Sequence, residues 1–280
     1  MPRVNHGVPE GPEIRIEAEQ IRAAVGGRVA RSVFFAFRRL KRFQNVLAGN
    51  RIGSVRARGK AILIGFDNGY TVYSHNQLYG KWVVCANGQA PDTTRQLRVA
   101  IHGPRRSALL YSASDVAVLD NTSLDEHPYL SRLGPDILNG RVTDRRIAAR
   151  FEEPAFCKRT LASLFLDQHF LAGIGNYLRS EILFAAGVHP RRCPQQLSSV
   201  EVLKLARATR KLMKQSLSTR GVTNDLARVR KLKSAGWSRD EYRFAVFARG
   251  GDACFVCGGR IERQSIAGRR CYFCPNCKPL

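Results

Sequence analysis

Apolar residues near the start of the chain recur at the spacing of an α-helix, over residues 12–25. Four of them fall on one helical face: Ile14, Ala18, Ile21 and Val25. Pro12 suits a first helical turn, where its missing N–H needs no partner. Gly11 can cap this helix, and Gly26-Gly27 can end it. We therefore expect a leading helix over residues 12–25 with one buried face.

Between about residues 28 and 119 the apolar positions form short runs that are typical of β-strands. Residues 61–66 and 70–73 are two such runs, and an Asn-Gly pair lies between them. This pair supplies the positive φ angles that tight hairpins require. We expect this half of the chain to be mainly β-structure, with residues 61–73 as its clearest hairpin.

Helical spacing returns from about residue 144 to residue 232. A first helix is predicted around three apolar residues that share a face: Leu161, Leu164 and Phe165. Glycines interrupt residues 172–176, and a second helix is expected over residues 177–186, ended by Gly187. Two helices joined by such a turn are a common DNA-docking element, and also an ordinary packing unit. Residues 222–243 are polar and basic, so we expect a long loop or a marginal helix there.

The charge balance narrows the choice of partner. The chain has 46 lysine and arginine residues against 22 acidic ones, a net charge of +24. Such a charge attracts polyanions, and a DNA duplex presents one negative charge per roughly 1.7 Å of its axis. An anionic membrane surface or general solubility is the alternative, but no basic amphipathic helix with an aromatic face stands out. We therefore expect a nucleic-acid partner.

No membrane partner is expected. No apolar run approaches the roughly 20 residues that a membrane span needs. Residues 1–30 also lack the apolar core of a signal peptide. A soluble, intracellular protein follows.

Cysteines gather at the end of the chain, and four of them form two Cys-x-x-Cys units: Cys254, Cys257, Cys274 and Cys277. Sixteen residues separate the two units, enough for a two-stranded ribbon that brings them to one tetrahedral ion. Four protein ligands leave no position for water, so one structural Zn²⁺ is expected. Disulfide pairing is the alternative, and an intracellular compartment disfavours it.

Cys271 is a competing ligand, because it also precedes Cys274 by the spacing of a Cys-x-x-Cys unit. That choice would leave Cys277 without a role, so we prefer Cys274 and Cys277. Three further cysteines are isolated and are expected to be buried small apolar residues: Cys85, Cys157 and Cys193. The linking ribbon also has a basic tip suited to phosphates, with Arg260, Arg263, Arg269 and Arg270.

Five motifs in order along the chain resemble the formamidopyrimidine-DNA glycosylase/endonuclease VIII family. They are Pro9–Glu13, Arg58–Lys60, Ser74–Gly80, Leu171–Tyr177 and the four-cysteine cluster. Gln77–Gly80 and Tyr111–Asp115 are more similar to the endonuclease VIII branch.

The resemblance implies an α+β, multidomain fold and a DNA-repair function. It implies an N-terminal β-sandwich with a leading helix over residues 9–138, a helix–two-turn–helix domain over 144–243, and a zinc ribbon over 244–280. Damaged double-stranded DNA would lie in the cleft between them. The implied activity is removal of oxidised pyrimidines followed by strand cleavage, by a monomer in the bacterial cytoplasm or nucleoid.

The resemblance also implies an N-terminal proline nucleophile, here Pro9. An α-amino group titrates near pH 8, so part of it is neutral at about pH 7. The positive end of an adjacent helix dipole would lower that pKa further. Attack by a secondary amine on the sugar C1′ gives an iminium that stays cationic and acidifies the C2′ proton. Elimination of the 3′ phosphate and then of the 5′ phosphate follows.

Glu10 is the natural acid/base partner of Pro9, able to protonate the sugar ring oxygen. Its alternative role, like that of Glu13, is to cap the first turn of a helix. The resemblance places Lys60 across the cleft on a backbone phosphate, whereas a lysine at the start of a strand is more often merely solvated.

The resemblance implies five DNA contacts. An extruded base leaves a gap in the duplex, and Gln77, Leu78 and Tyr79 resemble the family's void-filling segment. Without the resemblance, Leu78 and Tyr79 would be interpreted as core residues. Asn176 and Arg269 resemble the pair that clamps flanking phosphates, although Asn176 also suits an N-cap.

Pro9 departs from the family pattern, because its nitrogen is in an amide bond to Val8. Our hypothesis is that Val8, read from a GTG codon as methionine and then removed, is the true start, so that residues 1–7 are not in the mature protein. Pro2 at the terminus is a second route, but no acidic partner follows it.

Two other functions remain open at this point. If residues 1–8 are retained, a non-catalytic, zinc-containing nucleic-acid-binding protein gains most support. The other is purine excision of the formamidopyrimidine type, which would differ from the implied activity only in its substrate. By the resemblance, residues 222–243 form a longer segment than is typical of the branch, and this segment would lie near the extruded base. Lesion preference is therefore the inference that the sequence supports least.

Overall fold

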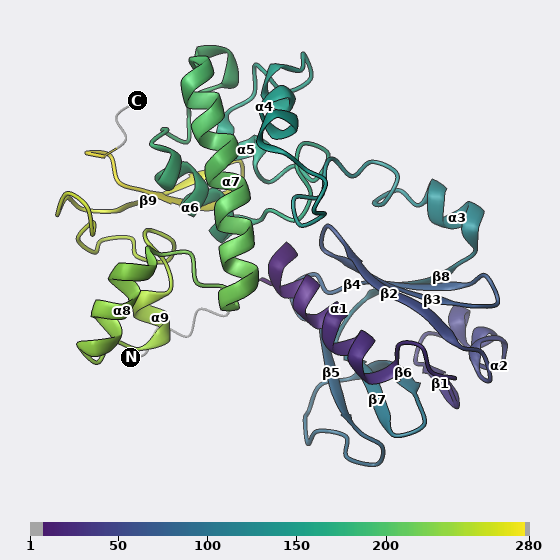
Figure 1. Cartoon of the computed structure of the whole chain (residues 1–280). Helices are drawn as coiled ribbons and strands as arrows, with labels where there is room; N and C mark the ends of the chain where they lie inside the picture. Colours follow the sequence, from purple (N-terminus) through teal and green to yellow (C-terminus); the bar gives the residue numbers. More distant parts are fainter. Residues whose placement is uncertain (1–7, 278–280) are drawn as a thin grey trace. The chain divides into compact units, whose positions relative to one another are not determined.

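A computed structural model describes residues 8–277 of the protein and divides the chain into two compact units (Figure 1). We call residues 13–132 the β unit. The helical unit consists of residues 8–12 together with residues 133–277. The predicted α+β composition is confirmed.

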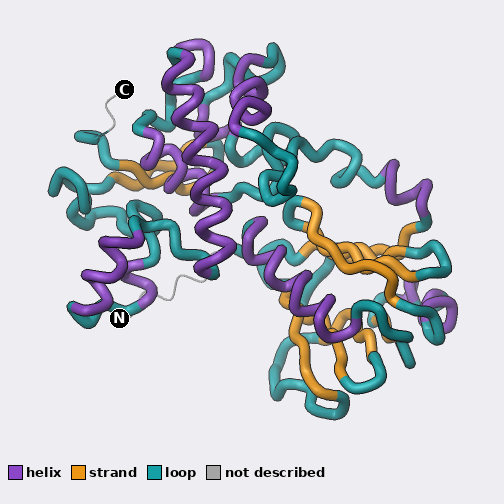
Figure 2. Tube along the Cα trace, viewed as in Figure 1, coloured by secondary structure: helices purple, strands orange, loops and turns teal. Residues whose placement is uncertain are grey.

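The β unit contains two four-stranded antiparallel sheets (Figure 2). One has the strand order β1 (Ser32–Phe35), β6 (Leu97–His102), β7 (Arg106–Tyr111) and β5 (Lys81–Ala86). The other has the order β2 (Ile52–Arg58), β3 (Ala61–Phe66), β4 (Thr71–His75) and β8 (Asp115–Leu119). Its helical segments are most of α1 (Gly11–Val25), a 3₁₀ turn (Arg38–Leu40), α2 (Phe43–Leu47) and α3 (Asn121–Glu126).

One hydrophobic core joins the two sheets and the leading helix. All four predicted apolar residues of α1 are buried, and they share a core with strand residues such as Ile64 of β3 and Ile101 of β6. Because side chains from both sheets fill this core, the predicted β-sandwich and leading helix are confirmed.

The hairpin predicted over residues 61–73 is present as β3 and β4. Its register pairs Ile64 with Val72, and the N–H of Phe66 donates to the carbonyl of Tyr70 across 2.8 Å. Within the turn, Gly69 has a φ of 86°, so glycine supplies the left-handed conformation as expected.

The helical unit contains the remaining helices and a two-stranded ribbon. They are α4 (Asp144–Glu152), α5 (Leu161–Leu164), α6 (Asn176–Ala186), a 3₁₀ turn (Pro194–Gln196), α7 (Ser199–Thr219), α8 (Leu226–Ser234) and α9 (Arg239–Tyr242), followed by β9 (Glu262–Ile266) and β10 (Arg269–Phe273).

Both helices predicted around the glycine-rich turn are confirmed. Leu161, Leu164 and Phe165 are completely buried in the core that α6 and α7 share. Gly187 ends α6 with a φ of 82°, the left-handed conformation that favours glycine after a helix.

The segment 222–243 is largely helical, so its interpretation as a long loop is wrong and the helical alternative holds. Asp225 caps α8 by accepting a hydrogen bond from the N–H of Arg228 across 2.8 Å. Ser238 and Glu241 form a capping box at α9. None of the helices in the described range 8–277 is both long and apolar enough to cross a membrane.

Candidate active site and metal centre

Glu10 is buried against the beginning of α6, with only 2% of its surface exposed. Its carboxylate accepts hydrogen bonds from the N–H groups of Gly175 at 2.6 Å, Tyr177 at 2.8 Å and Leu178 at 3.4 Å. These donors lie at the positive end of the α6 dipole, so the site favours a negative charge. The acid that the sequence singled out is therefore held by backbone groups more than 160 residues further along the chain.

Glycines make this approach possible. A Cβ atom on Gly175 would lie 2.5 Å from the carboxyl carbon of Glu10, closer than any real contact. The N–H of Gly11 donates to the carbonyl of Gly173 across 2.7 Å, and a Cβ on Gly11 would lie 3.0 Å from the Gly173 Cα. The Gly-x-Gly pattern, interpreted from sequence as a turn between helices, also forms the cradle for Glu10.

Pro9 directly precedes the buried carboxylate and is itself half-buried. Its nitrogen is bonded to Val8, which is 42% exposed. Residues 1–7, which our hypothesis about the start of the chain concerns, lie outside the described residues. Access to the Pro9 nitrogen therefore depends on whether Val8 is removed.

Lys60 lies in the β unit, after a left-handed Gly59 (φ 58°) in the turn between β2 and β3. Its N–H donates to the hydroxyl of Tyr129 across 2.9 Å, which fixes the backbone at this point. Burial lowers the pKa of nearby His75, and the charge of Lys60 lowers that pKa further. The lysine is half-buried beside a neutral histidine.

The segment Gln77–Tyr79 presents apolar side chains to solvent. Leu78 is 57% exposed and Tyr79 is 70% exposed, so their interpretation as core residues is wrong. Gln77 has a φ of 51°, and its side-chain oxygen accepts a hydrogen bond from Ser114 across 2.7 Å. A large apolar pair on a tight, hydrogen-bonded loop suits insertion into a ligand.

A buried polar pair lies beneath this loop. Asn76 is 2% exposed, and its amide donates to the carboxylate of Glu17 on α1 across 2.7 Å. Burial raises the pKa of Glu17 to about 7, although the hydrogen bond from Asn76 lowers it in part. This pair was not predictable from the sequence, because Glu17 is one of several acidic residues of α1.

Asn176 and the ribbon tip are joined by a buried arginine that the sequence analysis missed. Arg179 is fully buried, and its guanidinium donates to the side-chain oxygen of Asn176 at 2.7 Å and to the carbonyl of Arg270 at 2.8 Å. It also donates to the carbonyl of Ala162 at 3.1 Å. Because the Asn176 oxygen is occupied, its amide N–H groups are left to donate elsewhere, while Arg269 beside Arg270 is exposed.

The four predicted cysteines converge at the base of the ribbon. Their sulfur atoms all lie within 4.8 Å of one another. The Sγ atoms are 3.8 Å apart for Cys254 and Cys277, and 3.4 Å apart for Cys257 and Cys274. Zinc–sulfur bonds of about 2.3 Å in a tetrahedron separate sulfurs by about 3.8 Å, whereas a disulfide bond is about 2.05 Å long. The geometry therefore suits a metal ion and not disulfides.

Cys271 is separate from this cluster. It lies in β10, completely buried against Ala162 and Ile266, and burial raises the pKa of its thiol. The group of cysteines that could hold a metal ion includes Cys274 and Cys277 with the first unit, in line with the predicted set. Cys85, Cys157 and Cys193 are only half-buried, contrary to expectation.

Comparisons with known proteins agree over most of the chain. The family model described as formamidopyrimidine-DNA glycosylase N-terminal domain matches residues 8–114, and the H2TH domain model of the same glycosylase matches residues 133–227. The chain is 42% identical over 271 residues to Endonuclease 8 of Salmonella paratyphi B, covering 97% of this chain and 100% of the relative. Endonuclease 8 of Salmonella arizonae is equally similar.

Solved structures show the same fold. The Lactococcus lactis Fpg protein in complex with DNA containing an abasic site superimposes with a TM-score of 0.79 at 20% identity. The match covers 97% of this chain and 100% of that chain. At this level of identity the likeness establishes the fold.

Proposed function

Because the chain belongs to the formamidopyrimidine-DNA glycosylase/endonuclease VIII family, we propose that it excises oxidised bases, mainly pyrimidines, from double-stranded DNA and then cleaves the abasic strand. It would be a bifunctional DNA glycosylase and apurinic/apyrimidinic lyase, acting as a monomer on DNA inside a bacterial cell. The observation that carries the proposal is Glu10, buried next to Pro9 on the N-terminal N–H groups of α6.

The proposed chemistry begins with the nitrogen of Pro9, once it is freed from Val8. The neutral amine attacks C1′ of the sugar, the bond from C1′ to the damaged base breaks, and the attacking nitrogen loses its proton. Opening of the sugar ring breaks the C1′–O4′ bond and leaves an iminium between Pro9 and C1′. A base removes the C2′ proton, and the cation accepts the electron pair of the C2′–H bond, which then expels the 3′ phosphate. Removal of the C4′ proton expels the 5′ phosphate in the same way.

Glu10 would transfer the proton between these two steps. Three backbone N–H groups stabilise its charged form, so it begins as a carboxylate and can accept the proton that the Pro9 nitrogen loses. It then donates that proton to O4′ as the ring opens. The same buried position excludes water from the transfer.

The remaining site residues would bind DNA. Lys60 would contact a backbone phosphate, and Gln77, Leu78 and Tyr79 would fill the gap left by the extruded base. The exposed apolar surface of Leu78 and Tyr79 supports this role. Asn176 and Arg269 would clamp flanking phosphates, supported by the free amide of Asn176 and the exposed guanidinium of Arg269.

Cys254, Cys257, Cys274 and Cys277 would hold one structural Zn²⁺. The ion would fix the ribbon that carries Arg269, and it would take no part in the chemistry, since these four cysteines would supply all of its ligands.

Borohydride trapping tests the nucleophile. We expect protein that begins at Pro9, with its terminus verified by intact mass, to become covalently attached to abasic-site DNA when the iminium is reduced. Protein that keeps Val8, or whose Pro9 nitrogen is acetylated, should bind the same DNA without attachment. Trapping that is indifferent to the state of Pro9 would refute this nucleophile.

Intact-mass measurement on protein from its native host tests the start of the chain. A mature chain beginning at Pro9 supports the enzyme. A chain that retains residues 1–8 favours the second candidate, a non-catalytic zinc-containing nucleic-acid-binding protein, which the basic charge and the cysteine cluster would still serve. A panel of duplexes with oxidised pyrimidines and oxidised purines then decides the substrate class.

A further inference from the structure

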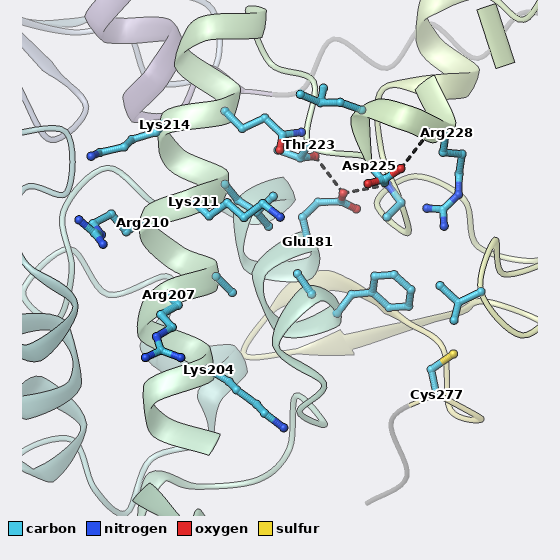
Figure 3. Close-up of a pocket in the computed structure, with 18 of the residues that line it drawn as sticks. Glu181, Lys204, Arg207, Arg210, Lys211, Lys214, Thr223, Asp225, Arg228 and Cys277 are labelled. Carbon is cyan, nitrogen blue, oxygen red and sulfur yellow. Dashed lines mark hydrogen bonds between the residues drawn. The ribbon is translucent and has the colours of Figure 1, made fainter. Parts of the chain in front are cut away.

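A second concave site lies within the helical unit, beside α7 (Figure 3). It has a volume of about 1040 Å³. Its walls come from α7, the second half of α6, the start of α8, and the cysteine ribbon through Val256 and Cys277. This volume is at the upper end of the roughly 300–1,000 Å³ typical of ligand sites. We call it the α7 groove.

The α7 groove is on the other side of α7 from the cradle that holds Glu10. The side chain of Met213 faces that cradle, since its terminal carbon lies 3.3 Å from the position of a Cβ on Gly173. At 100° per residue, Lys204 and Lys211 lie on nearly the opposite face of the helix from Met213. The groove is therefore separate from the proposed catalytic residues of this unit.

Unpaired positive charge lines one wall of the groove. Figure 3 shows Lys204 and Lys211 projecting from α7 toward the side where Asp225 and Cys277 lie, whereas Arg210 and Lys214 project the other way. Lys204 and Lys211 are exposed and have neither a hydrogen bond nor an ion pair with any residue of the described chain.

The acidic residues of the groove are already engaged. Glu181 accepts hydrogen bonds from the N–H groups of Ala245 and Val246, both at 2.8 Å. Asp144 forms an ion pair with Arg210 at 2.6 Å, and Asp225 caps α8. Arg228 adds a further positive charge at the start of α8. Asp225 also interacts electrostatically with Arg228 and Lys211. The lining nevertheless has six basic side chains against three acidic ones, so an incoming anion would meet an excess of positive charge.

The groove also has apolar surface. Leu226 is 42% exposed and Val256 is 65% exposed, and Phe184, which also lines the groove, is half-buried. The phosphates of a nucleic acid would pair with the lysines but have no apolar group to place on this surface. A peptide can place carboxylates on Lys204 and Lys211 and apolar side chains on Val256 and Leu226.

We propose that the α7 groove is a docking site for an acidic peptide segment of a partner protein, one in which Asp or Glu residues alternate with large apolar residues. It would recruit the protein through a surface that leaves the Glu10 cradle free. Binding of this peptide would need both the charged and the apolar parts of the groove, whereas binding of DNA would need the charged part alone.

Fluorescence anisotropy of a labelled peptide tests this, using full-length protein and a peptide of about 12 residues that alternates Asp or Glu with Leu. The test variant is Lys204→Glu with Lys211→Glu. The matched control, Arg145→Glu with Arg146→Glu, makes the same change in net charge at two exposed residues of α4 outside the groove. We expect wild type and control to bind, and the test variant to bind at least about tenfold more weakly.

Two further measurements separate the proposal from its alternatives. Val256→Ser keeps the charge of the groove and should also weaken binding, as should a peptide whose leucines are replaced by serine. Thermal unfolding verifies that each variant folds. No peptide binding by wild type, or equal weakening by the test variant and the α4 control, would overturn the proposal. The proposal would also be overturned if the test variant bound a single-stranded oligonucleotide more weakly than wild type but bound the peptide equally well.

Discussion

At the residue scale, the candidate active site depends on glycines, because a Cβ atom at Gly175 would overlap the carboxyl group of Glu10. The sequence identified Glu10 through its place in a motif, but it could not show what holds the carboxylate, because the donors are backbone N–H groups of α6. For Leu78 and Tyr79 the family motif was the more informative signal. Their apolar character alone would place them in a core, whereas the motif predicted a DNA-contacting role that agrees with their exposure.

Gly175→Ala is expected to displace the Glu10 carboxylate, because the new methyl group would lie 2.5 Å from its carboxyl carbon. The buried charge would lose hydrogen bonds, so we expect a loss of about 1–3 kcal/mol of unfolding free energy and at least about tenfold in strand cleavage. Gly140→Ala is the control, since nothing lies within 4 Å of its Cβ position. Equal cleavage rates in the two variants would show that the cradle is not needed.

Glu17 is expected to make stability depend on pH. Its pKa is raised from the usual 4.5 to about 7 in the folded protein, so the folded state binds a proton that the unfolded state has already lost between these values. Stability from this group is therefore complete below pH 4.5 and declines as the pH rises to about 7. Glu17→Gln removes this decline, which denaturant titrations at pH 5 and about pH 8 would measure, with a difference of about 1–2 kcal/mol. Parallel pH curves for wild type and variant would contradict it.

At the scale of elements, periodicity and turn chemistry predicted the structure where neighbours in sequence determine it. The β3–β4 hairpin follows from alternation around Gly69, and α6 follows from its apolar face and Gly187. The bond from Arg179 to the ribbon was not predictable, because it joins residues about 90 positions apart. The residues that cap α8 and α9 are Asp225, and Ser238 with Glu241. They are recognisable helix-start signals in the sequence, but the prediction for this segment did not rest on them.

Arg179→Lys should loosen both Asn176 and the ribbon tip. A lysine ammonium cannot reach the separate acceptors that the planar guanidinium serves. We expect about 2–4 kcal/mol lower stability and about tenfold weaker binding to a duplex with an abasic-site analogue. Arg191→Lys is the control, because within the described chain the guanidinium of this exposed arginine bonds to the side chain of Gln264 alone. Normal DNA affinity in Arg179→Lys would remove it as a positioning residue.

The proposed zinc site predicts different outcomes for two neighbouring cysteines, Cys274 and Cys271. Cys274→Ser should lose the ion, and amide hydrogen exchange should then show β9 and β10 unprotected, since a two-stranded ribbon is not stable alone. Cys271→Ser should keep one zinc per chain, because its thiol is outside the cluster. Zinc content measured by mass spectrometry distinguishes the two, and metal loss in Cys271→Ser would show that the ligands are wrongly assigned.

At the scale of the whole molecule, composition predicted the class of partner and motif order predicted the fold. The excess of 46 basic over 22 acidic residues pointed to a polyanion. The five motifs predicted a fold that the match to the Lactococcus lactis protein confirms. Neither the composition nor the motifs predicted the α7 groove, which forms only when α6, α7, α8 and the ribbon pack together.

The net charge of +24 predicts that DNA binding weakens steeply with salt. Each phosphate neutralised releases counterions, so contacts with about six phosphates would lower affinity roughly 10³-fold or more between 50 and 200 mM salt. If Arg269 contacts a phosphate, Arg269→Ala should reduce the slope of log affinity against log salt by about one. Arg191→Ala removes a neighbouring charge bonded to Gln264 and should leave the slope unchanged. Fluorescence anisotropy on one duplex measures these slopes. Equal slopes for both variants and wild type would show that Arg269 contributes only to the overall positive charge of the protein. The phosphate clamp would then depend on Asn176 alone.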